Sequence, residues 1–145
     1  MLKTAVLLIA TACAALAGAG TASAYASFSA WVSSANVWTY SNKLDVRGYA
    51  SYTDWDCTPG YQCDRNVQVE FELRRGFGAY SPLMARDYDE TGQYGSSVQA
   101  SFALPSCRFI PRYSSQTYTI VMTAVAPNGQ EKQSTRTVYQ QSCRR

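Results

Sequence analysis

Hydrophobic and polar residues alternate along most of the chain and predict β-strands. One run has apolar side chains at every second position: Val67, Val69, Phe71 and Leu73. Successive side chains of a strand point to opposite faces, so a period of two predicts a strand with one buried face. Similar patterns predict seven short strands, at about residues 27–33, 43–53, 66–74, 82–88, 97–104, 116–125 and 131–140.

Turn residues separate these strands. Pro127-Asn128-Gly129 lies between the last two runs, and Asn-Gly is a strong hairpin signal. Pro82 stands at the start of the fourth strand, where the missing backbone donor is tolerated if that strand lies at a sheet edge. No window has a helical stripe. Seven short antiparallel strands at this spacing predict one all-β domain, a two-sheet β-sandwich.

The stretch LPSCRFIPRYSSQTYTIVMTAVAPNGQ resembles the corner and final hairpin of immunoglobulin-like β-sandwiches, especially fibronectin type III modules. Tyr118 falls where the corner tyrosine of these folds occurs. The resemblance covers the last third of the chain well and the rest only by strand count. It departs from the family because no cysteine pair joins the second and sixth strands and because the connection before the sixth strand is long. It implies a fold and not an activity.

The first 24 residues predict export from a bacterial cell. They start with Lys3, continue through an apolar, alanine-rich run and end in Ala22-Ser23-Ala24, which is the pattern of a secretory signal peptide. A lipoprotein anchored through Cys13 is the alternative, but the preceding Ala-Thr-Ala matches a lipobox poorly. We therefore expect a secreted domain at residues 25–145, with no membrane insertion.

Charge excludes one class of partner. Loss of Lys3 with the leader lowers the net charge from +3 to about +2, which gives no general attraction to nucleic acid. Ten of the basic residues are arginine, whose planar guanidinium suits bidentate and stacked contacts better than lysine does.

Four cysteines follow the leader and predict two disulfides: Cys57, Cys63, Cys107 and Cys143. An even count in a small exported chain is typical of a disulfide framework. Of the three pairings, the tight turn favours Cys57–Cys63 and leaves Cys107–Cys143. The second bridge agrees with the strand order, since the fifth and seventh strands of an up-and-down sandwich finish at the same end. The spacing fits neither a zinc site nor a C-x-x-C redox pair.

No catalytic or metal site is expected. The chain has no histidine, so serine–histidine and cysteine–histidine nucleophiles are excluded. Carboxylates form two clusters, which we interpret as surface or turn residues: Asp54, Asp56 and Asp64, and Asp87, Asp89 and Glu90. The second cluster resembles the start of a calcium loop, but Val98 stands where the bidentate glutamate belongs. We expect neither enzyme activity nor a cofactor.

Aromatic residues in loops are the candidate binding residues. Trp55, Tyr61 and Tyr94 fall in predicted loops, with Asp54 and Asp56 beside the first. A large exposed ring indicates a partner, although Trp55 could instead cover the Cys57–Cys63 bridge as a lid.

Other tryptophans are assigned differently. We expect Trp31 and Trp38 in the core or packed at a sheet edge.

Two functions fit these features. The first is a secreted protein-interaction module: an adaptor, an inhibitor or a subunit of an extracellular complex such as an exported toxin assembly. The alternative is a glycan- or cell-wall-binding module that stacks rings on sugars. A row of exposed planar rings would favour the glycan, whereas a broad mixed patch or an apolar strand edge would favour the protein.

The predicted topology also separates charge. The two acidic clusters are expected at the end that carries the loop aromatics. The opposite end is expected to carry arginines and aromatics: Arg74, Arg75, Arg108, Arg112, Arg144 and Arg145, with Phe77, Tyr80 and Tyr113. Ordinary solvated loops at both ends are the alternative.

Overall fold

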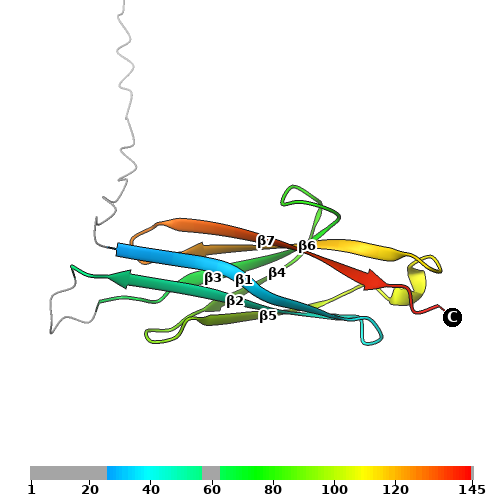
Figure 1. Ribbon diagram of the computed structural model, residues 1–145, viewed down its shortest axis with the longest axis horizontal. Coiled ribbons are helices and arrows are strands. Elements are labelled where there is room, and N and C mark those ends of the chain that lie inside the picture. Colours follow the sequence, from blue (N-terminus) through cyan, green and yellow to red (C-terminus); the bar gives the residue numbers. More distant parts are fainter. Residues whose placement is uncertain (1–25, 57–62, 145) are drawn as a thin grey trace, which may run out of the picture.

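The computed structural model describes residues 26–56 and 63–144 (Figure 1). The expected leader, Cys57, Tyr61 and Arg145 lie outside the described residues. All seven predicted strands are confirmed: β1 (Ala26–Trp38), β2 (Lys43–Asp54), β3 (Gln68–Arg75), β4 (Leu83–Glu90), β5 (Ser97–Ala103), β6 (Ser115–Val125) and β7 (Glu131–Gln141). A short 3-10 helix, η1 (Cys107–Phe109), lies before β6. Among the described residues, no helix has the length and apolar character needed to cross a membrane.

Two antiparallel sheets form a β-sandwich-like fold. One has the order β1-β2-β5 and the other β4-β3-β6-β7. The connections after β2, β4 and β6 lie at one end, while the β1–β2 turn, the β5–β6 connection and the C-terminal segment lie at the other (Figure 1). The predicted distribution of these loops is therefore confirmed.

A single apolar core fills the space between the sheets. The inward residues follow the period of two, for example Leu44, Val46, Phe71 and Leu73, each at most 1% exposed. Gly48 lies close to the facing sheet, and a Cβ added there would lie 2.7 Å from the sulfur of Met122. A larger residue at this position would require the Met122 side chain to move.

Side chains cover the edge strands where the two sheets meet. On one side, Asp89 Oδ2 accepts from the backbone N–H of Gln99 at 2.7 Å, and Asp87 Oδ2 accepts from that of Ser101 at 3.3 Å. On the other side, the N–H of Val32 donates to Ser134 Oγ at 3.2 Å. Both aspartates belong to β4, which extends to Glu90 and so two residues beyond the predicted strand; Asp89 was wrongly expected in the following loop. Since covered edges resist pairing with another strand, recognition by strand addition is disfavoured.

A buried polar network joins four segments at the C-terminal end. Asn42, in the left-handed conformation at φ 52°, accepts through Oδ1 from Cys107 N at 2.8 Å and from Gln140 Nε2 at 3.2 Å. Tyr118 is fully buried, and its hydroxyl donates to Gln140 Oε1 at 3.1 Å. The partner of Tyr118 is thus a side chain of β7, which differs from the backbone partner of a corner tyrosine.

The Cys107–Cys143 disulfide is confirmed. Its sulfurs are 2.04 Å apart, and it ties η1 to the segment after β7 across a sequence separation of 36. The expected Cys57–Cys63 bridge stays a prediction, because Cys57 lies outside the described residues.

Candidate functional site

The outer face of the β1-β2-β5 sheet carries an exposed aromatic patch. Trp31 is 47% exposed and Trp38 56% exposed, so neither belongs to the core; both lie on β1, an edge strand, which agrees with the other expected position. Trp31 lies directly opposite Tyr49, and their rings stack at 4.2 Å with an interplanar angle of 24°. We call this surface the tryptophan face: Trp31, Asn36, Trp38, Asp45, Arg47 and Tyr49.

A β-bulge places both tryptophans on this face. In a regular strand, residues seven apart point to opposite sides. The register of β1 shifts between Val32 and Ser34, so Trp31 pairs with Tyr49 and Trp38 pairs with Lys43 on the same side. The hydroxyl of Ser33 donates to the Arg47 carbonyl at 3.0 Å and holds the bulge. The positions of the apolar residues in the sequence reflect the shift. Val32 and Val37 are five residues apart and would point to opposite faces of a regular strand, yet both pack on the core.

Asp45 fixes the orientation of Trp38. Its Oδ2 accepts from Trp38 Nε1 at 2.9 Å, and its Oδ1 accepts from Ser101 Oγ at 2.9 Å. Lys43 Nζ lies 3.0 Å from Oδ1. The hydrogen bond from Lys43, followed by those from Ser101 and Trp38, lowers the pKa of Asp45. The indole is therefore held before any partner arrives, which reduces the entropy lost on binding.

A polar groove borders the tryptophan face. It has a volume of about 520 Å³ and runs along the meeting of β5 and β4. Arg47, Gln99 and Ser101 line it from one sheet, and Asp87 and Asp89 from the other. Among the described residues, the ion pairs involve only Lys43, Arg74 and Arg86 as cations. The Arg47 guanidinium is thus available to an incoming carboxylate.

The outer face of the other sheet is occupied by its own contacts. Glu72 Oε2 lies 2.5 Å from Arg74 Nη2, and Glu72 Oε1 lies 3.0 Å from Arg86 Nη2. Arg86 Nε also lies 2.9 Å from Glu70 Oε1. Arg74 was expected among the free arginines at one end of the molecule. This expectation is wrong, because Arg74 is paired with Glu72. The outer face of this sheet also exposes rings, Tyr88 and Tyr139, but its arginines are paired, whereas Arg47 on the tryptophan face is in none of the ion pairs of the described residues.

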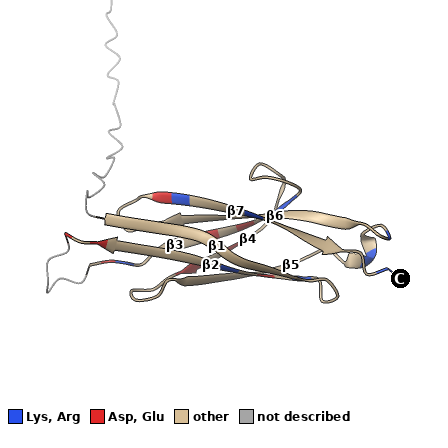
Figure 2. Ribbon diagram, in the orientation of Figure 1, with Lys and Arg blue, Asp and Glu red and all other residues tan. Residues whose placement is uncertain are grey.

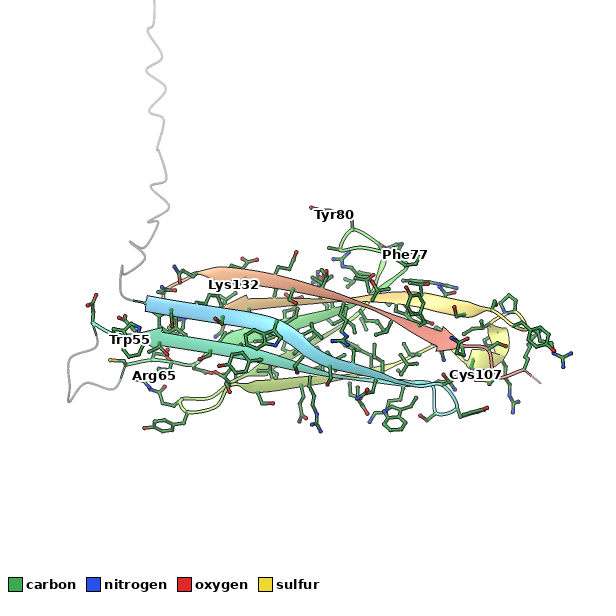
Figure 3. All side chains as sticks on the ribbon, viewed as in Figure 1. Trp55, Arg65, Phe77, Tyr80, Cys107 and Lys132 are labelled. Atoms are coloured by element: carbon green, nitrogen blue, oxygen red, sulfur yellow. A yellow bond between two sulfur atoms is a disulfide. The ribbon has the colours of Figure 1, made fainter. Side chains whose placement is uncertain are left out.

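The β3–β4 loop also lies against that second sheet. The Gly78 N–H donates to Thr119 Oγ1 at 3.0 Å, and the Phe77 and Tyr139 rings meet edge to face at 6.4 Å. Figure 3 shows Tyr80 at the tip of this loop, away from the end that carries Cys107. The loop was expected at the arginine-bearing end, and its hydrogen bonds to β6 instead hold it on the side of the sandwich.

The ion pairs of Glu72 predict a pH-dependent contribution to stability. Burial opposes ionisation of Glu72, but hydrogen bonds from Arg74 and Arg86 outweigh it and lower the pKa. A lowered pKa stabilises the fold above the ordinary value of about 4.3, and this contribution is lost as pH falls through the folded-state value. We expect Glu72→Gln to cost about 2 kcal/mol in urea unfolding at neutral pH and much less in acid. The exposed Glu131→Gln is the control, and an equal cost of Glu72→Gln at both pH values would contradict the assignment.

The predicted loop site is only partly described. Trp55 is 71% exposed and Tyr94 is 92% exposed, on two loops at the same end of the molecule (Figure 1). Asp54 Oδ1 accepts from the backbone N–H of Asp56 at 3.0 Å and so closes a local turn. Tyr61 lies outside the described residues. The binding role of these five residues stays a prediction.

Comparison with known proteins assigns no family: no protein-family model matches the chain, and no curated protein matches its sequence. Fold and surface together define a class, an all-β protein of two antiparallel sheets with an exposed aromatic sheet face.

Proposed function

We propose that this chain is a secreted, non-enzymatic protein-interaction module that binds an extracellular protein through the tryptophan face. The observation that carries the proposal is the β-bulge, which turns Trp31 and Trp38 to the same side of the sheet as Tyr49 and Arg47. Tryptophan, tyrosine and arginine are the residues most often found as binding hot spots. A bulge that only relieved strain would have no need to expose two indoles.

The size of the face suits a protein partner. β1 and β2 run for roughly 40 Å and β5 for roughly 24 Å, which gives a flat face of roughly 500 Å², the larger part of the roughly 800 Å² that each partner buries in a standard interface. The surface is also a broad mixed patch, with Asn36, Asp45 and Arg47 between the rings. Charged and amide groups around aromatic anchors are the expected anatomy of such an interface.

The fold supports membership of the immunoglobulin-like group, in its fibronectin type III form. The fourth strand pairs with the third, in the order β4-β3-β6-β7, and leaves β1-β2-β5 as a three-stranded sheet. In constant-type immunoglobulin domains the fourth strand instead completes the first sheet. The leader-like start and the Cys107–Cys143 bridge support export to an oxidising compartment.

Glycan binding is the second candidate because the face also presents amides beside aromatic rings. Stacking on sugars needs free ring faces, however, and Trp31 and Tyr49 cover one face of each other. The mutual stack therefore favours a protein, which can use ring edges and sides as well as faces.

Photo-crosslinking tests the surface and the partner class together. A photoreactive amino acid replaces Asn36 on the tryptophan face or Thr135 on the opposite sheet in the exported protein. We expect a discrete protein adduct from the culture supernatant at position 36 only. A carbohydrate adduct at position 36 would support the second candidate, and equal adducts at both positions would contradict the proposed surface.

Once the partner is captured, alanine variants measure the contribution of the rings. We expect Trp31→Ala with Trp38→Ala to weaken binding by about 2–4 kcal/mol, roughly 30- to 1000-fold. Phe77→Ala with Tyr80→Ala removes two comparably exposed rings from the β3–β4 loop and should have little effect. If Trp55→Ala with Tyr94→Ala alone abolishes binding, the loop end and not the sheet face is the recognition surface.

A further inference from the structure

Basic residues lie at the end of the molecule that carries the C-terminal segment (Figure 2), opposite the end that carries Trp55 (Figure 3). The Cys107–Cys143 disulfide joins two segments that each continue with an arginine, Arg108 and Arg144. The Arg144 Nε donates to the Arg108 carbonyl, which brings the two residues together. We call this cluster the arginine end: Arg108, Phe109, Arg112, Tyr113 and Arg144.

Further hydrogen bonds make the arginine end rigid. The N–H of Ser142 donates to the Ser114 carbonyl at 3.0 Å, and its hydroxyl donates to the Ile110 carbonyl at 3.1 Å. The Ser114 hydroxyl donates to the Pro111 carbonyl at 2.6 Å and closes the turn around Tyr113. Backbone and disulfide therefore position these side chains without a ligand, as a preformed binding site requires.

Among the described residues, no carboxylate side chain forms an ion pair with the arginine end. After Glu90 the chain contains a single acidic residue, Glu131, which lies at the start of β7 near the other end. Arg108, Arg112 and Arg144 form no ion pair within the described chain, in contrast to Arg74 and Arg86. Figure 2 shows basic residues at this end, and acidic residues toward the opposite end and along the sheets. The small net charge of the protein hides this local excess.

Two exposed rings accompany the guanidinium groups. Phe109 is 81% exposed and Tyr113 is 91% exposed. Tyr113 adopts the left-handed conformation at φ 60°, which is uncommon for a bulky residue, and the Arg112 guanidinium lies 5.2 Å from its ring centroid. The exposed tyrosine ring therefore lies beside an arginine on an unusual backbone conformation.

We propose that the arginine end binds an acidic glycan. The guanidinium groups of Arg108 and Arg144 pair with its carboxylates or phosphates, since their planar forks match both groups. The Phe109 ring and the face of the Tyr113 ring that Arg112 does not cover stack on its sugars. This site lies apart from the tryptophan face, so the protein would link an extracellular protein to an envelope polysaccharide.

Nucleic acid fits this cluster less well than an acidic glycan. Proteins that bind nucleic acid strongly neutralise about 6–10 phosphates, and the described arginine end offers three arginines. An anionic sugar needs few ionic contacts when rings supply the remaining affinity.

Isothermal titration of the oxidised exported protein tests the proposal. The probes are polygalacturonate, a teichoic acid, neutral dextran and single-stranded DNA, at physiological ionic strength. We expect binding to at least one of the two acidic glycans and none to dextran. We expect Arg108→Gln with Arg144→Gln to weaken it at least about tenfold, since a hydrogen bond to a charged group contributes roughly 1.5–3 kcal/mol.

Control variants separate a built site from bulk charge. Lys132→Gln with Arg136→Gln removes the same charge from β7 and should leave affinity within about twofold, as expected for distant surface charges. Phe109→Ala with Tyr113→Ala should weaken the glycan without changing the charge. Equal losses from both charge variants, binding to DNA alone, or no binding to either acidic glycan would each overturn the proposal. Trp31→Ala with Trp38→Ala should leave glycan affinity unchanged, so this test fails or succeeds independently of the protein-binding proposal.

Discussion

Replacement of Cys107 and Cys143 by alanine is expected to lower the free energy of unfolding by about 4 kcal/mol. The bridge closes a loop with a sequence separation of 36, and the chain-entropy model assigns a stabilisation of this size to such a loop. Cys107 is also buried at 3% exposure, so the change removes packing as well as the cross-link. Urea unfolding of the oxidised proteins measures the difference.

The double variant also separates this bridge from the predicted Cys57–Cys63 bridge. Reduction of the wild-type protein breaks every disulfide, whereas the variant removes only one. We expect reduction to cost about 2 kcal/mol more than the double variant, because a bridge across a tight turn constrains the unfolded chain less than the longer loop does but still measurably. A loss below about 1 kcal/mol in the variant would show that strain or residual structure cancels the entropic gain.

The second large effect is expected at Gln140, a fully buried polar side chain of β7. Its Nε2 donates to the Pro105 carbonyl at 3.0 Å and to Asn42 Oδ1, while its Oε1 accepts from the Tyr118 hydroxyl. Gln140→Leu leaves the buried Tyr118 hydroxyl without its partner and removes one hydrogen bond each from the Pro105 carbonyl and Asn42 Oδ1, at a cost of about 2–4 kcal/mol. Gln141→Leu, at the exposed neighbouring position, should change stability by less than about 0.5 kcal/mol.

A double-mutant cycle identifies the origin of this cost. Tyr118→Phe removes one partner and should cost about 1 kcal/mol by itself. The double variant should lose less stability than the two single variants do in sum. With phenylalanine at position 118, the leucine at position 140 leaves no tyrosine hydroxyl unsatisfied. Additive losses would show that Gln140 acts through packing and not through the network. Calorimetry or chemical unfolding of the four proteins provides the comparison.

The strands could be predicted from the sequence because a half-buried strand has an apolar residue at every second position. Val69, Phe71 and Leu73 alternate with charged residues in β3, and the same alternation recurs in β2 and β5. The Cys107–Cys143 pairing also followed from the sequence, since strand order places both cysteines at one end. Period, turn chemistry and cysteine arithmetic are local signals, and they agree with one another.

The tertiary structure decided the position of the side chains that carry the proposed functions. The outward turn of Trp31 and Trp38 depends on the bulge at Ser33, and a bulge arises from pairing with β2. In the same way, Glu72 pairs with both Arg74 and Arg86, so Arg74 is not a free basic residue. The disulfide brings Arg108 beside Arg144. The sequence by itself therefore predicted the strands and one covalent link, because the burial period, the turn residues and the cysteine count can be read along the chain. Which rings and charges meet a partner depends on register and on contacts between strands distant in the chain, and these exist only in the folded protein.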